Sequence, residues 1–474
     1  MPKALALLGA VLMAGCAMAP DYRPPVTTAP GEFRETPGWA AAAPRDGEER
    51  GPWWAVFADP VLSDLEDRAG QASPTLAAAL ARYDAARAAA RMQAADLYPQ
   101  VSASGQASRE RLSGNRPLGA GNAQEYDDYV VGGGVSYELD LWGRIRSQVR
   151  GARGEAEASA ADLASARLSL QAAVADAYFR LVGLDAQAQL LARSVDAFTR
   201  AYELTATRRE GGIASGIDVN RARTVLANAR AQVATVANQR AATEHEIAAL
   251  VGELATTFTV PAQVQALDPP APPAATPSEL LQRRPDIAAA ERRVFAANAR
   301  IGAARAAFFP SLTLGASGGW ESTGGGLLTT PSAFWALGPL SGLLTVFDGG
   351  RRTSQVRISR AEYDEAAATY RDTVLAAFRQ VEDALAATRY LSEASTAQRE
   401  AAEAAQRTSD IAMSRYRDGA SDYLEVVTAQ TDALEAQRSY ISVQTQRMQA
   451  SVGLVRALGG PPDAALAVIP TAAP

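Results

Sequence analysis

The chain has 474 residues and a formal net charge of -6 at pH 7, with one cysteine, one histidine and one lysine. The mild negative charge and the absence of a basic block argue against a nucleic-acid-binding protein. His245 lies in a helical pattern without a nucleophile motif nearby, so we expect a packed or solvated histidine and not a catalytic one.

Residues 1–15 have the pattern of a secretory signal. An apolar run from Ala4 to Ala14 follows a lysine and is too short to cross a bilayer as a helix. Small residues then precede Cys16, which resembles a bacterial lipoprotein signal whose cysteine is acylated. Ala17 follows, and in proteobacteria a residue other than aspartate there generally permits sorting to the outer membrane. The alternative is an ordinary signal peptide with an incidental cysteine.

Cleavage before Cys16 has a chemical consequence. The remaining chain holds no lysine, and its single cysteine is acylated at the sulfur. A P-loop lysine, a Schiff-base lysine, a catalytic thiol or a Cys/His metal cluster then cannot be built. We therefore predict a protein that is not an enzyme and has no cofactor, catalytic or metal site.

The folded part is predicted to begin after a proline- and alanine-rich arm. The arm leads to the pair Trp53-Trp54, which fits either an aromatic membrane anchor or packing against the folded body. Packing is the expected outcome. An alanine-rich helix is predicted to follow, from Leu62 to Ala95.

After this helix the apolar period changes to two, which is typical of β-strands. Residues 101–107, 129–141 and 312–320 alternate, whereas the return strand near residues 334–347 alternates less cleanly and contains Pro339. Four strands of about ten residues fit a transmembrane β-barrel, or a soluble hairpin packed on helices. A bacterial barrel needs at least about eight strands to close, so a membrane-spanning sheet would have to be shared among several chains.

Each strand pair leads into a long helical pattern. A Gly-Arg pair starts both patterns, at Arg144 and Arg351, and no proline interrupts the first one before Glu210. About sixty-five helical residues extend roughly 95 Å, some three bilayer thicknesses, so most of each helix is expected outside the membrane. The heptad spacing favours helices that wrap around neighbours, and a soluble coiled-coil rod stays open as an alternative.

The long helices end in two similar turns. A shift of 207 residues superimposes them, as from Gly212 to Gly419. In each turn a glycine that stops the first helix is followed by a capping-box pattern that starts the second. The capping-box pairs are Ser215 with Asp218, and Asp422 with Glu425. The chain is therefore a tandem repeat of long helical hairpins.

The repeat predicts six segments. They are a signal peptide (1–15), an acylated extended arm (16–60), a first repeat of helix, β-hairpin and long helical hairpin (61–256), a proline-rich linker (257–280), a second repeat (281–460) and a disordered tail (461–474). The second repeat opens with the motif Arg283-Arg284-Pro285-Asp286-Ile287.

The order of lipoprotein signal, Trp-Trp arm, helix, strand pair, Gly-Arg turn and helical hairpin, repeated after this motif, resembles the TolC-like outer-membrane factor family. The chain is most similar to the lipoprotein branch that serves resistance-nodulation-division efflux pumps, over about residues 16–460. The resemblance implies a mainly α fold with a small transmembrane β part. Duplicated hairpins from three chains would form an α-barrel joined to a shared twelve-stranded β-barrel.

The resemblance also implies a function and partners. The homotrimer would be a passive, gated duct, lipid-anchored in the outer membrane, with a long periplasmic portion. It would export small molecules such as drugs and toxic compounds, together with a periplasmic adaptor (membrane fusion) protein and an inner-membrane resistance-nodulation-division transporter. The alternatives are an outer-membrane duct for type I protein secretion and a lipid-anchored periplasmic coiled-coil scaffold without a pore.

In this family the second-repeat tip closes the periplasmic end of the tunnel and opens when the adaptor binds. Tyr416 and Asp218 match a pair whose hydrogen bond latches the two hairpins. The aperture positions are Asp422, Leu424 as an apolar constriction, Glu425 as an acid facing the pore, and Thr428, where a second acid is usual. The tip positions expected to contact the adaptor are Gly212, Ser215, Gly419 and Ser421, the last standing where some members carry a latch arginine.

Overall fold

The computed structural model describes residues 18–25, 52–115, 121, 123–263, 268–270, 284–324 and 334–460. The chain divides into two compact units. We call the first, Met1–Val26, Arg82–Ala160 and Ala289–Arg371, the sheet unit. The second, Thr27–Ala81, Ala161–Ala288 and Asp372–Pro474, is the hairpin unit. The predicted signal peptide, the predicted acylation site Cys16, most of the predicted linker and the predicted tail lie outside the described residues.

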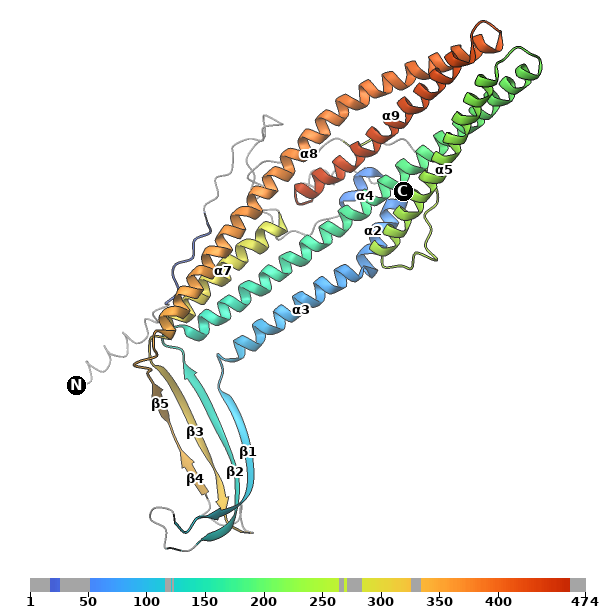
Figure 1. Ribbon diagram of the computed structural model, residues 1–474. Helices are drawn as coiled ribbons and strands as arrows, with labels where there is room; N and C mark the ends of the chain where they lie inside the picture. The colour runs from blue at the N-terminus through green and yellow to red at the C-terminus, as the bar shows by residue number, and fades with distance from the viewer. Residues whose placement is uncertain are drawn as a thin grey trace, which may run out of the picture. The chain divides into compact units, whose positions relative to one another are not determined.

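The sheet unit contains one antiparallel sheet (Figure 1). Its strands are β1 (Gln100–Leu112), β2 (Gln124–Leu139), β3 (Ser311–Ser322), β4 (Phe334–Leu337) and β5 (Leu340–Leu343). Strand β2 lies between β1 and β3, and both β4 and β5 pair with β3. The register sets Val135 opposite Val101 on one side and Ala316 on the other, so the predicted apolar face is continuous across the strands.

The fourth predicted strand is broken into two, which corrects the expectation of one strand near residues 334–347. The break falls at Gly338-Pro339, and the second piece ends at Leu343. Proline has no backbone N–H to give to a strand partner, although its carbonyl still accepts from Gly315 N at 2.8 Å. The polypeptide therefore stays beside β3 along both pieces.

The helices confirm the duplication of long helical hairpins, although the first parts of α4 and α8 belong to the sheet unit. Helices α4 (Arg144–Glu210) and α8 (Arg351–Arg417) each have 67 residues, and α5 (Gly216–Leu250) and α9 (Tyr423–Ala457) each have 35. The glycines at the turns have positive φ at matching places, 74° at Gly212 and 80° at Gly419. Identical lengths and stops give the two repeats the same hairpin.

The predicted helix from Leu62 to Ala95 is two helices, α2 (Pro60–Ala72) and α3 (Pro74–Ala95). Pro74 disfavours a helical backbone at the residue before it, and Ser73 is extended with φ -64° and ψ 122°. The proline then serves as the first residue of α3, where a missing N–H costs nothing.

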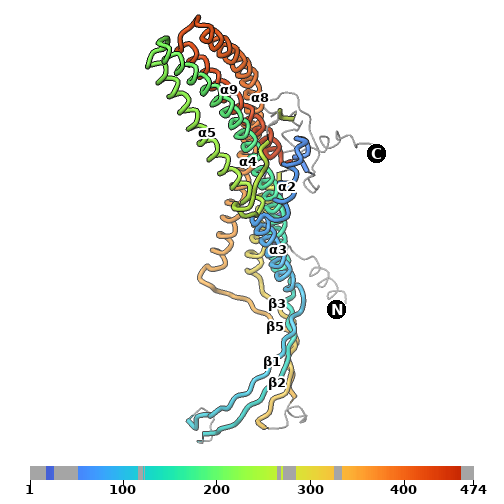
Figure 2. Tube along the Cα trace, turned by 90° about the vertical axis from the view of Figure 1, so that its right-hand side faces the viewer, coloured from blue at the N-terminus to red at the C-terminus, as the bar shows by residue number. Residues whose placement is uncertain are grey.

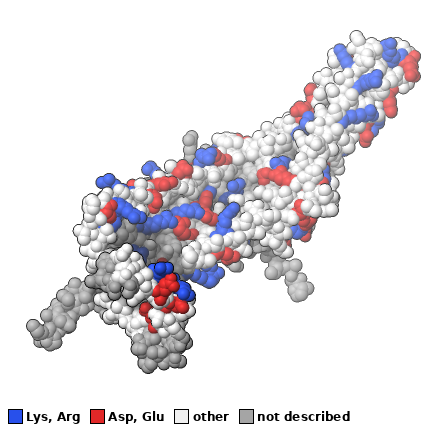
Figure 3. Space-filling model, turned by 60° about the horizontal axis from the view of Figure 1, so that its bottom comes forward, with Lys and Arg blue, Asp and Glu red and all other residues white. Residues whose placement is uncertain are grey.

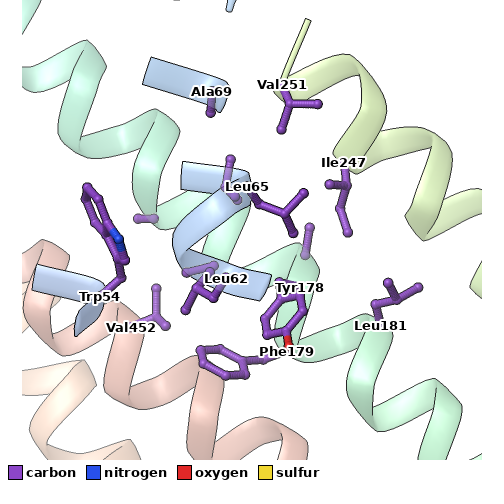
Figure 4. Packing of buried hydrophobic residues seen from close by; sticks show 14 of the residues in the cluster. Trp54, Leu62, Leu65, Ala69, Tyr178, Phe179, Leu181, Ile247, Val251 and Val452 are labelled. Atoms are coloured by element: carbon purple, nitrogen blue, oxygen red, sulfur yellow. The ribbon is translucent and has the colours of Figure 1, made fainter. Parts of the chain in front are cut away.

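The largest core of the hairpin unit forms where α2 and the Trp-Trp pair cover α4, α5 and α9 (Figure 4). Trp53 is 1% exposed and Trp54 9%, so the pair packs in the interior as expected and is not a membrane anchor. The Tyr178 hydroxyl donates to Asp59 at 2.6 Å beneath them. Asp59 also caps α2 through the amides of Val61 and Leu62.

The Arg-Arg-Pro-Asp-Ile motif at the start of the second repeat contacts the end of α9 in the hairpin unit. The guanidinium of Arg284 is buried, pairs with Asp286 at 2.6 Å and donates to the main-chain oxygen of Ala457 at 3.0 Å. Pro285 is the first residue of α7 (Pro285–Ala306). The motif therefore ties the start of α7 to the end of α9.

No described helix has a stretch that is both long and apolar enough to cross a bilayer. His245 is exposed on α5, as a solvated histidine should be. Charged residues of both signs lie side by side along the helices on the face shown in Figure 3.

Candidate functional site at the helix tips

The tip of the first hairpin is held by a complete capping box. The Ser215 hydroxyl accepts from the Asp218 amide at 3.2 Å, and the Asp218 carboxylate accepts from the Ser215 amide at 3.1 Å. The same carboxylate also accepts from the Ser215 hydroxyl at 2.7 Å. Asp218 is thus occupied by its own turn.

The tip of the second hairpin is capped from one side only. Asp422 accepts from the Glu425 amide at 3.0 Å, but the Glu425 carboxylate pairs with Arg415 of α8 at 3.1 Å. The expected reciprocal box is therefore half formed, because a nearby guanidinium is a stronger partner for a carboxylate than a backbone amide. One arginine compensates the acid that was predicted to face a pore.

Tyr416 joins the two hairpins, whose tips lie side by side in Figures 1 and 2. Its ring is 3% exposed, in a cluster with Ala201, Ala222, Tyr423 and Val426. Its hydroxyl lies 3.1 Å from the Thr205 hydroxyl of α4. The predicted hydrogen bond to Asp218 is not among those formed in the described tips, where the Tyr416 hydroxyl meets Thr205 instead.

Arg208 adds a second contact between the hairpins. Its guanidinium lies 4.4 Å from the centre of the Tyr416 ring, and it donates to the main-chain oxygen of Arg417 at 3.2 Å. That oxygen is at the C-terminal end of α8, where the helix dipole favours a cation. Burial, with Tyr416 and Asp218 nearby, raises the pKa of the neighbouring Tyr423 to about 12.

The predicted aperture residues share one exposed face of α9. Leu424, Glu425 and Thr428 are exposed, whereas Tyr423 and Val426 on the other face are buried. Leu424 is 47% exposed and, with Ile217 of α5, lines a depression of about 470 Å³ between the hairpins. The helix thus presents the three residues together.

The positions expected to contact an adaptor lie in the turns. Gly212, Gly419 and the backbone around them are exposed, and Ser421 is half-buried with a hydroxyl that has no partner in the described structure. Ile213, beside Gly212, is 78% exposed. The sequence interpretation missed Thr205, Arg208 and Arg415. The two arginines carried a signal, because each lies among the basic residues in the last turn of a long helix, and Thr205 carried none.

An antiparallel sheet with an exposed apolar face, in a chain with duplicated long helical hairpins, is the combination expected of an outer-membrane duct, and comparison with known proteins identifies the family. The family model described as "Outer membrane efflux protein" matches residues 65–253 and 276–460. The antibiotic efflux pump outer membrane protein ArpC of Pseudomonas putida is 34% identical over 95% of this chain and 94% of its own. The pyoverdine export outer membrane protein OpmQ of Pseudomonas aeruginosa is 34% identical over 97% of both chains. The solved outer-membrane channel OprN is 30% identical, with a TM-score of 0.85 over 94% of this chain and 99% of its own.

The chain therefore belongs to the outer membrane efflux protein family. It is the outer-membrane channel component of a tripartite efflux pump, with its long helices in the periplasm. The prediction that it is not an enzyme agrees with this membership.

Proposed function

We propose that three copies of the chain share one twelve-stranded barrel, each contributing β1, β2, β3 and the broken strand β4/β5. The observation that carries this proposal is a sheet with two open edges. Among the described strands, β1 pairs only with β2, and β4 and β5 pair only with β3. Lipid cannot satisfy the backbone groups of an open edge, so both edges need partner strands.

The side chains of the sheet support a membrane location. The face built around Val101, Val131, Val135 and Leu314 is apolar and exposed, with Val101 79% accessible. The opposite face carries Ser102, Ser136 and Glu138. An apolar outer face and a polar inner face are what a water-filled transmembrane barrel requires.

We propose further that the barrel is continuous with a tunnel of helices, closed at the tips by the second hairpin. The contact of Tyr416 with Thr205 and Arg208 is the latch in this proposal, and Asp218 caps its own helix beside it. Leu424, Glu425 and Thr428 face the aperture. Arg415 neutralises part of the charge of Glu425, so the aperture is weakly cation-selective.

The proposed partners and cargo are those of a tripartite efflux pump. An adaptor protein meets the exposed turns at Gly212, Ser215, Gly419 and Ser421, and a resistance-nodulation-division transporter supplies the energy. Relatives are named for antibiotics, toluene and pyoverdine, which supports export of small molecules and not of proteins. Acylation of Cys16 anchors each chain to the outer membrane.

The barrel is tested by two arginines on adjacent residues of β2. Val135→Arg places a charge on the apolar face, which costs roughly 2 to 4 kcal/mol at mid-bilayer, whereas Ser136→Arg places it on the polar face. We expect Val135→Arg to lose most of the trimer in outer-membrane fractions and Ser136→Arg to keep it. Equal yields of trimer from the two variants, or a monomeric wild type, would contradict the shared barrel.

The latch is tested by single-channel conductance of the trimer in planar bilayers. Tyr416→Phe removes the hydroxyl that meets Thr205, and we expect a several-fold rise in open probability. Thr205→Val should give the same result from the other side. Tyr390→Phe is the matched control, because Tyr390 on the same helix α8 is 54% exposed. Unchanged gating in both latch variants would contradict this assignment.

A further inference from the structure

The described part of the N-terminal arm lies along one stripe of α7 in the sheet unit. The stripe consists of Glu291, Phe295, Asn298 and Gly302, which are spaced three and four residues apart and so share one face. Each of the four contacts the arm, as described next. The arm and the stripe are about 280 positions apart in the sequence, as the separation of 278 between Pro20 and Asn298 shows.

Three arm residues make the contacts. The Asn298 side chain donates to the main-chain oxygen of Pro20 at 2.9 Å, and Asn298 is only 8% exposed. The Tyr22 hydroxyl donates to the Glu291 carboxylate, and the Tyr22 ring meets the Phe295 ring edge-on with centroids 5.2 Å apart. Burial and the bond to Glu291 hold the pKa of Tyr22 above its ordinary value, so the hydroxyl keeps its proton.

Gly302 makes the fit specific. A Cβ atom at this position would lie 2.6 Å from the Cβ of Ala19 and 2.9 Å from its main-chain nitrogen. Backbone atoms cannot swing aside as a flexible side-chain end can. Glycine therefore forms a notch into which Ala19 fits, and any larger residue would displace the arm.

The neighbouring stripe of α7 is fixed to α4, so the arm docks on a rigid surface. A Cβ at Gly154 of α4 would lie 3.2 Å from Ala296, and Arg300 pairs with Glu155 at 2.6 Å. Among the described residues no arm segment covers α3, the corresponding helix of the first repeat, and its Met92 is 73% exposed. Only the helix of the second repeat receives the arm in the described structure.

We infer that this stripe of α7 is the docking site of the lipidated arm and sets where the acyl chains enter the membrane. Ala19 is three residues from Cys16, a span of at most about 11 Å. Gly302 is four residues, or about 6 Å of helix rise, before the end of α7 at Ala306, and β3 starts at Ser311. The anchor is thereby held beside the base of the sheet. This inference rests on the proposed acylation of Cys16.

Two glycine-to-alanine substitutions provide a matched test of whether the arm docks on α7. Both Gly302→Ala and Gly453→Ala occur inside helices and gain the same helix propensity, but a Cβ at Gly453 meets nothing within 4 Å. Chymotrypsin must bind the Tyr22 ring to cleave after it, and in the docked arm this ring packs against Phe295, so cleavage should be faster when the arm leaves α7. We expect cleavage of the detergent-extracted trimer at Tyr22 at least ten-fold faster in Gly302→Ala, and unchanged in Gly453→Ala, with the site identified by the mass of the released fragment.

A second variant lies on the arm and leaves α7 intact. Tyr22→Phe keeps the cleavage site but loses the hydroxyl that donates to Glu291, so it should also be cleaved several-fold faster. Equal rates in the wild type and both variants would overturn the docking site. If Gly302→Ala is cleaved faster while trimer yield in the outer membrane equals that of Gly453→Ala, the arm docks there but does not position the anchor.

Metabolic labelling with a palmitate analogue separates the inference from the proposal on which it rests. The label should appear on the wild type and on Gly302→Ala, and be lost in Cys16→Ser. A wild type without label would contradict both the proposed lipid anchor and its positioning by the arm. Docking of the arm on α7 would then still be decided by the cleavage rates.

Discussion

The two repeats have identical hairpins but hold them with different chemistry, and one arginine in each repeat shows how. Arg240 on α5 and Arg447 on α9 occupy the same position in the repeat. Arg240 pairs with Asp185 at 2.6 Å and Glu244 at 3.2 Å. In the second repeat serines replace both acids, at positions 392 and 451. Arg447 donates to Gln444 at 2.7 Å and Ser395 at 3.4 Å, and the exposed Asp268 lies 3.8 Å away.

The acids of the first repeat also hold the chain that leaves the hairpin. Glu244 accepts from the Val260 amide at 2.7 Å, Asp185 accepts from the Gln263 amide at 3.1 Å, and Arg240 donates to the Val260 oxygen at 2.8 Å. This segment leads toward the second repeat. Both copies of the helix pair are therefore kept, but only the first copy has the acids that bind the segment leaving the hairpin.

The largest expected effect comes from removing Arg240. Arg240→Ala leaves Asp185, whose side chain is 4% exposed, as a buried carboxylate without its cation, which costs on the order of 3 to 5 kcal/mol. Arg447→Ala removes only neutral partners and a distant aspartate, and should cost about 1 kcal/mol. The helical circular dichroism of the trimer, followed through a denaturant titration, measures both.

The double variant Asp185→Ala/Arg240→Ala is the control for this comparison, because it removes the stranded charge. It should be more stable than Arg240→Ala alone. If Arg240→Ala and Arg447→Ala lower the free energy of unfolding equally, the two arginines stabilise their repeats to the same extent.

Glu66 sharpens the comparison, because it lies on α2, which covers the core beside the first-repeat hairpin. It is 1% exposed, neither carboxylate oxygen has a hydrogen-bond partner in the described structure, and burial raises its pKa to about 9. Between pH 4.5 and 9 the folded chain thus binds a proton that the unfolded chain has released. Stability falls as pH rises through this window, by at most about 1.4 kcal/mol per unit.

Glu66→Gln should therefore be more stable than the wild type at pH 8 and lose the decline in melting temperature between pH 6 and pH 8. Asp432→Asn, at an exposed site on α9, is the control and should leave that decline in place. A wild type whose melting temperature is constant between these pH values would contradict the buried, protonated Glu66.

The parts of the fold set by local pattern could be predicted from the sequence. The heptad spacing, the helix-stopping Gly212 and Gly419 and the strand alternation gave the hairpins and three of the strands. The break before Pro74 and the split at Pro339 were missed, although each proline carried the signal, because the surrounding apolar pattern continues across it.

The site was predicted only in part. The resemblance to the family indicated the aperture positions Leu424, Glu425 and Thr428, which share an exposed face, but not the partner of Tyr416. Thr205 is 211 residues away, and which of its neighbours a hydroxyl meets depends on how two helices are rotated against each other. The docking of Tyr22 on α7 is hidden for the same reason.

The smallest expected effect is at the tips, where three hydrogen bonds join Ser215 to Asp218 in the first repeat and one joins Asp422 to Glu425 in the second. Asp422→Ala removes the cap from the Glu425 amide and a negative charge from a helix start, at a cost of about 1 kcal/mol, or roughly a five-fold loss of hydrogen-exchange protection in the first turn of α9. Ser215→Ala also removes a cap, the acceptor of the Asp218 amide, but keeps the Asp218 carboxylate at the helix start, so it should cost less, about 0.5 kcal/mol. Protection factors measured at both tips of one trimer decide between them. A larger loss of protection at the first tip would mean that contacts other than the cap stabilise the start of α9. The second tip, which is proposed to open, would then not be the more weakly capped of the two.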